Sequence, residues 1–565
     1  MMHLFLRFYS GFLAALLLFG GTYLRTRLGK IEIGSLEPFF LLFLILLAIT
    51  RKLFPSDWNR FHQDLCALLN AAKDATRSRR RLIAWLFIIF GAAFLAHVAR
   101  HYSYDTHLFD MGFLHQAVFY PFSDGTILQA DLSPKRSYLV DHFSPALLLL
   151  APVSSWLHSH IVIYLLQCVI LALGTYFLIS SGPIKANRSL WFIAGILVLA
   201  NRSLRNGAIW DFREDVLAFS FLCGALVFLS EKRWLLYLLS LSAYLLSKEH
   251  LGMVALGLIV PILLDRDLGF SRTERRRLAL TTAALVLIWT ACLFGLITPK
   301  LHEGLTDASN ISLRLPRYGT TPGTIILHLL THPLALAELI LDKVTNFPAI
   351  KYIVLLLAPG LFFSWRAWPW LFAAAFGISM NLIFGNRFQI SMNYHYDLAF
   401  LPFLLWAALL GLRKASTLQV RGVSALIVGI ALAIGFSGRW PMFHVFSNFP
   451  SSQAIADIRY IEKLPCTPSE SLAASPLVLG LASHCPEIRI LGFPENCDDP
   501  WRLFQSMTRD TSRLEGQSAL NARLILLDRN QPCQSHFEKA LLSRNALTRS
   551  ESPSKRWVLV ERSLP

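Results

Sequence analysis

The sequence predicts an all-α membrane protein with many transmembrane helices, followed by a small α/β domain at the C-terminal end. Hydrophobic residues make up 54% of the 565 residues and charged residues only 16%, which is more apolar material than a soluble domain can bury. Apolar runs recur at roughly the 20-residue length that a helix needs to cross a bilayer. After residue 440 the pattern changes to short apolar runs with frequent Pro, which is typical of a separate folded domain.

We interpret about 13 apolar runs as membrane spans. The first run lacks a convincing small-residue cleavage site, so we expect an anchor and not a removed leader. The expected spans cover residues 8–24, 35–53, 82–99, 160–180, 189–203, 213–230, 234–247, 250–264, 278–297, 349–364, 370–385, 397–412 and 422–438. The predicted parts are an N-terminal two-helix membrane segment with a basic cytoplasmic loop (1–81), a membrane domain (82–438) with a large outer loop (100–158), and an extracytoplasmic α/β domain (439–565).

Basic residues in the short loops indicate which side of the membrane is cytoplasmic. The stretches ending at Arg81 and Arg277, and the basic loops at 231–233 and 413–414, fall on one side if the spans alternate. Positively charged loops stay in the cytoplasm, so we expect a multi-pass membrane protein with a cytoplasmic N-terminus. The large loop, the segment 298–348 and the C-terminal domain are then extracytoplasmic. This topology accounts for much of the net charge of +17, and the sequence carries no nucleic-acid-binding motif.

The C-terminal segment reads as a helix followed by short strands. "AIADIRYIEKL" has the spacing of an amphipathic helix, and "RLILLD" and "WVLVE" are typical of strands. An even number of cysteines in an extracytoplasmic segment predicts disulfides, with three connectivities open, and free thiols are the alternative. These cysteines are Cys466, Cys485, Cys497 and Cys533. The segment carries no phosphate-binding Gly-rich loop and no nucleophile elbow, so we expect a binding or structural role for it.

Polar clusters recur at the outer ends of several spans. They are "LVDHFSPALLLLAP" (139–152), "NGAIWDFREDVLAF" (206–219), "LLSKEHLGM" (245–253) and "MNYHYDLAFLPF" (392–403). A charge near lipid is costly unless it faces water or a partner, so four such clusters predict a shared polar cavity that opens outward. Each cluster alone is also explained by helix capping or by snorkelling at a span end.

The large loop carries several carboxylates, of which Asp110 is the strongest catalytic candidate. It lies between Phe109 and Met111, in a segment whose apolar residues are expected to dock a short helix on the membrane surface. A carboxylate held against an apolar face is partly desolvated, and desolvation raises its affinity for a proton, as a general base requires. The alternative is a structural carboxylate at a helix start. Asp105 and Asp124 are interpreted as solvated loop acids.

These motifs together resemble a known family of membrane proteins. The stretches that carry the resemblance are "FDMGFLHQAVFY", "DHFSPALLLLAPV", "WDFREDVLAF", "SKEHLGM" and "NYHYDLAFLPFLLWAAL". They look like the bacterial membrane-protein family called domain of unknown function 2079, and the likeness extends over most of the chain. The third motif of that family usually reads Asp-Phe-His, whereas this chain has Arg213 in place of the His.

That family in turn resembles the GT-C glycosyltransferases, multispanning enzymes that take a sugar from a polyprenyl phosphate. In such enzymes an acidic residue of the first large outer loop usually acts as the catalytic base, and a Pro-rich short helix follows. Asp110 and "HFSPALLLLAPVSSWLHS" occupy these places. The resemblance therefore implies a GT-C-like membrane domain, a lipid-linked sugar donor as partner, and sugar transfer on the outer face of the membrane.

An inverting sugar transfer needs a base for the acceptor hydroxyl, and cations or donors for the departing lipid phosphate. Asp110 is the predicted base. The candidate phosphate ligands are Arg205, Arg213, Lys248 and His250, and the candidate ligands of sugar or phosphate oxygens are His142, Tyr394 and His395. The remaining candidate substrate-binding residues are Gln116, Asp141, Asp211, Glu214 and Glu249. No cofactor is required by this scheme, but His142, Asp141 and Asp110 are also a candidate set for a divalent metal.

Two other classes of function remain open from the sequence. A transporter or flippase of a lipid-linked or anionic substrate usually shows internal repeats with interrupted helices, and the sequence shows no convincing repeat. A non-catalytic envelope protein is the second alternative, with the C-terminal domain binding a partner. The sugar, the acceptor and the oligomeric state are not specified by the sequence.

Overall fold

The structure is a computed structural model of the chain. It describes residues 2–19, 23–26, 29–32, 37–76, 78–106, 111–123, 125–131, 133–303, 315, 317–319, 322–345, 347–383, 388–415, 445, 449–464, 466, 471–474, 478, 480–485, 487–490, 522–530, 534, 538–539, 541–542 and 547–561. The expected span at 422–438, the loop acids Asp110 and Asp124, and the cysteines Cys497 and Cys533 lie outside the described residues.

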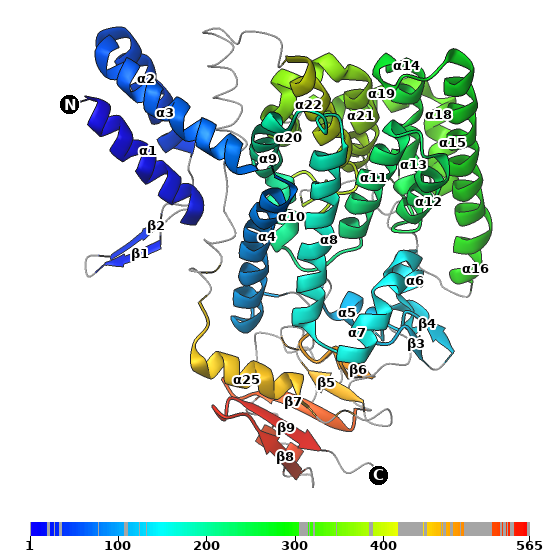
Figure 1. Ribbon diagram of the computed structural model, residues 1–565. Helices are drawn as coiled ribbons and strands as arrows, with labels where there is room; N and C mark the ends of the chain where they lie inside the picture. The colour runs from blue at the N-terminus through cyan, green and yellow to red at the C-terminus, as the bar shows by residue number, and fades with distance from the viewer. Residues whose placement is uncertain are drawn as a thin grey trace.

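The N-terminal helices lie beside the main bundle (Figure 1). They are α1 (Met2–Phe19), α2 (Glu37–Leu53) and α3 (Pro55–Thr76), and an antiparallel hairpin of β1 (Tyr23–Thr26) and β2 (Gly29–Glu32) lies between α1 and α2 in the sequence. Arg7 of α1 forms an ion pair with Asp64 of α3, which ties the first helix to the third. The helix α3 also packs on the bundle, against α4 and α9.

Most of the remaining described chain forms one helical bundle. Its helices are α4 (Arg79–Tyr102), α8 (His160–Ser181), α9 (Trp191–Leu199), α10 (Arg202–Ile209), α11 (Asp215–Ser230), α12 (Trp234–Leu245), α13 (Leu251–Leu256), α14 (Ile259–Leu264), α15 (Arg272–Cys292), α16 (Thr298–Leu301), α18 (Pro322–Thr331), α19 (Pro333–Thr345), α20 (Phe347–Ser364), α21 (Trp368–Ile383) and α22 (Leu401–Ala415). The prediction of a mainly helical chain is confirmed.

Fewer described helices than predicted are long enough to cross a bilayer by themselves. Among the described residues, three are long and apolar enough, namely Arg79–Tyr102, His160–Ser181 and Arg272–Leu301. Others are shorter apolar helices, such as Asp215–Ser230 and Trp234–Leu245. The reason is visible in the chain: polar segments interrupt the apolar runs, so one predicted span at 189–203 becomes the short helices α9 and α10. The predicted count of spans therefore stays a prediction.

The bundle is held together by close helix packing. The helix α8 lies between α4 and α11, α11 packs on α12, and α20 and α21 both pack on α22. At Gly411 of α22, an added Cβ would lie 1.9 Å from the carbonyl oxygen of Phe363, so only a glycine allows α22 to approach α20 this closely. Tight packing of this kind supplies dispersion contacts where lipid offers no hydrophobic driving force between helices.

The first large loop (residues 100–158) folds against one end of the bundle (Figure 1). It contains α5 (Phe113–Phe119), the hairpin β3 (Phe122–Ser123) and β4 (Thr126–Ile127), α6 (Tyr138–Asp141) and α7 (Ala151–Leu157), with the short 3-10 helices Pro134–Arg136 and Pro145–Leu149. Every residue of α5 is buried. The basic starts of α4 and α15 lie toward the opposite end of the bundle.

The C-terminal segment packs beneath the large loop and combines one helix with a sheet. Its elements are α25 (Ser452–Glu462), β5 (Leu472–Ala474), β6 (Ile488–Ile490), β7 (Leu524–Asp528), β8 (Leu547–Glu551) and β9 (Trp557–Glu561). The strand order is β6-β5-β7-β9-β8, with β5 parallel to β6 and β7, and β9 antiparallel to β7 and β8. The central strand β7 is buried along its whole length, which explains its continuous apolar sequence "LILL".

A disulfide joins two of the four cysteines in this segment. Cys466, after α25, is bonded to Cys485, before β6, across a sequence separation of 19 residues. This pairing is one of the connectivities that the sequence left open. Closing a loop of this length is typically worth about 3 kcal/mol, because it restricts the unfolded chain.

We predict that this disulfide forms in the protein. Digestion without reductant should yield one peptide pair that links Cys466 to Cys485 and separates on reduction, as measured by mass spectrometry. A Cys485→Ser variant serves as the control, since it should lose the linked pair. Recovery of Cys466 as a free thiol, or linked to another cysteine, would contradict the pairing.

Candidate functional site

The four polar segments predicted from the sequence meet at the end of the bundle that carries the large loop. Lys248 lies at their centre: its Nζ is 2.8 Å from a carboxylate oxygen of Glu214 and 2.9 Å from one of Asp215. The three residues are at most 5% exposed. Burial opposes the positive charge of Lys248, but Asp215 and Glu214 outweigh this effect and hold its pKa above the ordinary value.

These charged residues lie at or between the ends of consecutive helices, and these helix ends are next to each other. Asp211, Glu214 and their neighbours lie in the break between α10 and α11, and Lys248 lies in the turn between α12 and α13. Because α11 and α12 are adjacent packed helices, these breaks lie side by side. Asp215 begins α11, where the positive end of the helix dipole favours a carboxylate.

Two further groups complete this charged cluster, which we define as Tyr138, Glu214, Asp215, Lys248 and His395. The Tyr138 hydroxyl of α6 donates to Glu214 over 3.2 Å. His395 Nε2 lies 3.5 Å from an oxygen of Asp215. The cluster therefore joins the large loop, two helix starts and the segment before α22.

A second pair lies beside the charged cluster. His142 Nδ1, just after α6, is 3.2 Å from a carboxylate oxygen of Glu249. Burial opposes the positive charge of His142, but the Glu249 charge and hydrogen bond outweigh it and raise the pKa to about 9. Burial likewise opposes the charge of Glu249, and His142 nevertheless lowers its pKa to about 2. The pair is ionic at neutral pH.

Arg100 organises a third group of polar residues. Its guanidinium donates to the carbonyl oxygens of Ile209 and Asp105, each over 2.6 Å, and lies 3.3 Å from Asp211. It also lies 4.9 Å from the centre of the Trp210 ring, and the centre of the Tyr394 ring lies 4.5 Å from that of Trp210. The loop acid Asp105, expected to be solvated, is about half exposed and also pairs with Arg100 at 3.0 Å.

Asp397 positions the segment that carries His395. Its carboxylate accepts hydrogen bonds from Ser203 at 2.5 Å, Tyr352 at 2.6 Å and Asn381 at 3.0 Å. These donors belong to α10, α20 and α21. Asp397 is 1% exposed, so the shared carboxylate fixes this segment to three helices and thereby orients the histidine two residues earlier.

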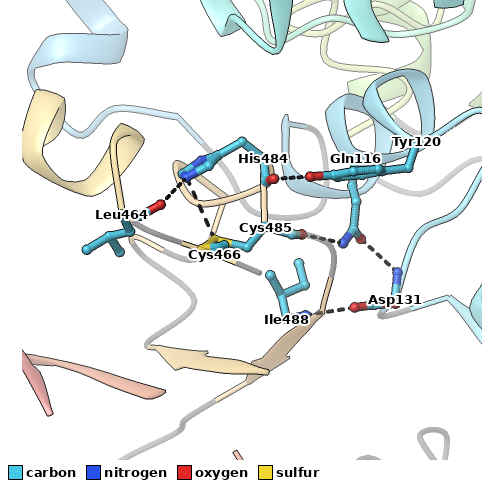
Figure 2. Close-up of a disulfide and its surroundings, with 8 residues drawn as sticks. All are labelled: Gln116, Tyr120, Asp131, Leu464, Cys466, His484, Cys485 and Ile488. Carbon is cyan, nitrogen blue, oxygen red and sulfur yellow. Dashed lines mark hydrogen bonds between the residues drawn. A yellow bond between two sulfur atoms is a disulfide. The ribbon is translucent and has the colours of Figure 1, made fainter. Parts of the chain in front are cut away.

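Gln116 lies at the junction of the large loop with the C-terminal segment (Figure 2). Its side chain donates to the carbonyl oxygen of Cys485 over 3.1 Å and accepts from the amide of Asp131 over 2.7 Å. The Tyr120 hydroxyl donates to the carbonyl oxygen of His484, and Asp131 accepts from the amide of Ile488 over 2.7 Å. These contacts indicate that Gln116 docks the C-terminal segment.

The candidate residues from the sequence thus fall into distinct places. Glu214, Lys248 and His395 belong to the charged cluster, His142 and Glu249 form the adjacent pair, and Asp211 and Tyr394 lie with Arg100. His250 follows Glu249 and interacts electrostatically with Asp215 and His142. Arg213 precedes Glu214 and is partly buried, Arg205 is 4% exposed on α10, and Asp141 is exposed at the end of α6. Asp110 lies outside the described residues.

Sequence reasoning did not select Arg100, Tyr138 and Asp215 as site residues. Arg100 carries a usable signal, because an arginine in the last turn of an apolar helix needs a buried partner. Asp215 stands directly after Glu214, in the predicted polar segment 206–219. No sequence pattern distinguishes Tyr138, because its hydroxyl comes close to Glu214 only in the folded structure.

The charged cluster provides a cation between two carboxylates, with a hydroxyl and an imidazole beside them. Such a set can donate hydrogen bonds to an anionic group or transfer a proton, provided that a ligand displaces some of the internal pairs. The proposed divalent metal set of His142, Asp141 and Asp110 gains no support from the described residues, because His142 pairs with Glu249 and Asp141 is exposed.

Fold and site define a polytopic helical membrane protein with a buried charged cluster at one end of its bundle. The chain belongs to the family described as predicted membrane protein (DUF2079), whose model matches residues 100–475. The matched region contains all four polar segments, and the family resemblance inferred from the sequence is confirmed. No curated protein matches the chain.

Among the solved structures that resemble the chain distantly are two crystal structures of one protein. The crystal structure of ArnT from Cupriavidus metallidurans bound to undecaprenyl phosphate shares 15% identity at a TM-score of 0.47, covering 85% of this chain and 97% of that chain. The crystal structure of the same ArnT in the apo state shares 15% identity at a TM-score of 0.40, covering 80% and 93%. A likeness this distant assigns neither a fold nor an activity to the chain.

We predict that Lys248→Met strongly destabilises the protein. The substitution leaves Glu214 and Asp215 as buried carboxylates without their cation, at a typical cost of about 3–5 kcal/mol. Thermal unfolding in detergent measures the effect. The control is Lys185→Met, which breaks an exposed ion pair with Glu231 and should cost at most about 1 kcal/mol. Equal losses in the two variants would show that the cluster is not a major source of stability.

The pair of His142 and Glu249 predicts a specific pH dependence. Its contribution to stability is largest between the ordinary pKa of Glu and 6.5, because the pKa of His142 is raised and that of Glu249 is lowered. The contribution declines as the pH rises from 6.5 through about 9. Melting temperatures should show this decline in the wild type and lose it in Glu249→Gln. An identical pH profile for both proteins would contradict the pairing.

Proposed function

We propose that this protein is a membrane glycosyltransferase. It transfers a sugar from a polyprenyl-phosphate-linked donor to an acceptor on the outer face of the bacterial inner membrane. The observation that supports the proposal best is the convergence of four polar segments at the end of the bundle that carries the large loop. Charged groups at such a depth are costly, and function is a common reason for keeping them.

The groups at this end suit the charges of the proposed reaction. A departing lipid phosphate needs cationic or hydrogen-bonding groups, and Lys248, Arg213, His250 and His395 lie at or next to the cluster. Lys248 already has two carboxylate partners, so we propose that it stabilises the arrangement of the site when no ligand is bound. Arg213 and His250 are the proposed phosphate ligands. Tyr394 and His142 are proposed to contact the sugar.

Asp110 remains the proposed general base, by its place in the large loop and by the family resemblance. The residue that follows it, Met111, is buried and accepts a hydrogen bond from the Tyr164 hydroxyl of α8 at 3.0 Å. This anchor fixes the chain next to Asp110 to the bundle. A base at this place would accept the proton of the acceptor hydroxyl as the sugar is transferred.

A non-catalytic envelope role is the second candidate. The charged groups of the cluster already pair with one another without a ligand. Ion pairs of this kind also hold helices together, which favours a structural role. In that case the charged cluster fixes the bundle, and the C-terminal segment provides the functional surface. The experiment below separates the two roles.

The purified full-length protein should release polyprenyl phosphate from at least one member of a panel of polyprenyl-phosphate-linked sugars, when supplied with crude envelope acceptors. We predict that Asp110→Asn lowers this turnover by roughly 100- to 10,000-fold, the usual value of general-base assistance, while membrane insertion and melting temperature are preserved. The matched control is Asp124→Asn, in the same loop, which should be nearly silent.

Two outcomes would decide against the proposal. If Asp110→Asn and Asp124→Asn behave alike, the catalytic assignment of Asp110 fails. If no donor in the panel is consumed, and deletion of residues 450–565 abolishes the cellular role that Asp110→Asn leaves intact, the non-catalytic role is the correct one.

A further inference from the structure

A cluster of imidazoles and one carboxylate lies at the junction between the bundle and the C-terminal segment, away from the charged cluster. Its members are His101, near the end of α4, His160, the first residue of α8, and Glu462, the last residue of α25. His101 Nε2 lies 2.8 Å and His160 Nδ1 lies 3.4 Å from the same oxygen of Glu462. One ligand atom of each residue lies within 4.8 Å of the others.

This spacing is close to that of ligands around one metal ion. In a tetrahedral site with bonds of about 2.0–2.1 Å, neighbouring ligand atoms are roughly 3.4 Å apart. The distances from Glu462 to His101 and His160, 2.8 and 3.4 Å, are at or below this value, and the ligand atoms of all three residues lie within 4.8 Å of one another. His101 and His160 are at most 1% exposed, so an ion between them would be shielded from water.

A third imidazole stands next to this group. His115 of α5 is completely buried, and its ring centre lies 4.9 Å from that of His160. Neither of its ring nitrogens has a hydrogen-bond partner among the described residues. Buried polar groups are almost always satisfied, so two unsatisfied nitrogens on one buried ring indicate a missing partner. A metal ion is a partner that an imidazole can take in a dry site.

The ligand chemistry selects the kind of metal. Imidazole nitrogens with one carboxylate suit zinc and similar divalent transition metals, whereas magnesium and calcium prefer sites made of oxygen atoms. His160 Nε2 also lies 2.7 Å from the Ser483 hydroxyl, which can hold the ring while Nδ1 faces the ion. The nearby Cys466 and Cys485 are bonded to each other and offer no thiolate.

We propose that His101, His160 and Glu462 bind a zinc ion, with His115 as the fourth ligand. The ligands come from α4, α8, α5 and α25, so the ion links two long bundle helices and the large loop to the C-terminal segment. Its role is structural: it fastens the C-terminal segment against the end of the bundle. The site is separate from the charged cluster and does not depend on the proposed glycosyl transfer.

The test uses the purified full-length protein, stripped with a chelator and kept without reductant so that the disulfide stays closed. Titration with zinc, followed by removal of free metal and elemental analysis, should give about one tightly bound zinc per chain. The melting temperature should rise on zinc addition, because the ion binds only the folded state. Cobalt added in place of zinc should give the intense visible bands of a tetrahedral site.

The decisive variant is Glu462→Gln. Its amide oxygen still accepts hydrogen bonds from His101 or His160, so the metal-free melting temperature should change little. Loss of a residue that only hydrogen-bonds a metal ligand typically lowers metal affinity by roughly 10- to 100-fold. Because Glu462 is proposed as a direct ligand, the zinc affinity of Glu462→Gln should fall by more than this. Zinc should then no longer raise the melting temperature of the variant. His115→Phe, which fills a similar volume without a ligand atom, should also weaken zinc binding.

Two matched controls exclude other zinc sites. Glu249→Gln alters the carboxylate that pairs with His142, and His332→Ala alters the exposed stacked pair of His328 and His332, whose ring centres are 4.3 Å apart. Both variants should bind zinc as the wild type does. The proposal is overturned if the wild type retains no zinc, if Glu462→Gln binds it equally well, or if excess magnesium displaces it.

Discussion

The cost of burying charge is the constraint on which this structure depends. Lys248 is buried with Glu214 and Asp215, and none of these groups could remain charged at this depth alone. Glu214 and Asp215 lie at the start of α11, and Lys248 lies in the turn between α12 and α13. These helix ends must therefore lie next to each other for the charges to pair. Asp397 applies the same constraint to the segment before α22, by binding donors from three other helices. Polar contacts therefore specify an arrangement that apolar packing alone would leave open.

The same end of the bundle carries two kinds of polar group with different tasks. The charged cluster joins bundle helices to α6 of the large loop through Tyr138. A second set, including Gln116 and Asp131, joins the large loop to the C-terminal segment through backbone groups near the disulfide. The loop is thus held on both sides. This double attachment holds the residues from Met111 onward between the bundle and the C-terminal segment.

Several features of the site followed from residue patterns. Glu214, Lys248, His142, Glu249 and His395 were selected because charged residues at the ends of apolar runs need partners, and the structure pairs all five. Gln116 belongs to the same conspicuous motif as Asp110, yet it contacts the C-terminal segment. A motif indicates that a polar residue needs a partner, but it does not show which part of the chain supplies that partner.

The sequence by itself determined the helical membrane character, the helix-then-strand pattern of the C-terminal segment and the polar segments at the helix ends. These depend on local composition and periodicity, which are readable within a window of residues. Only the tertiary structure decided that Lys248 pairs with Asp215 as well as Glu214, that Cys466 pairs with Cys485, and that His101, His160 and Glu462 share one place. Glu462 is more than 300 positions from both histidines, with a separation of 361 from His101, and no local pattern encodes a contact at that distance. Such contacts arise from the packing of the C-terminal segment on the bundle, which is a property of the whole fold.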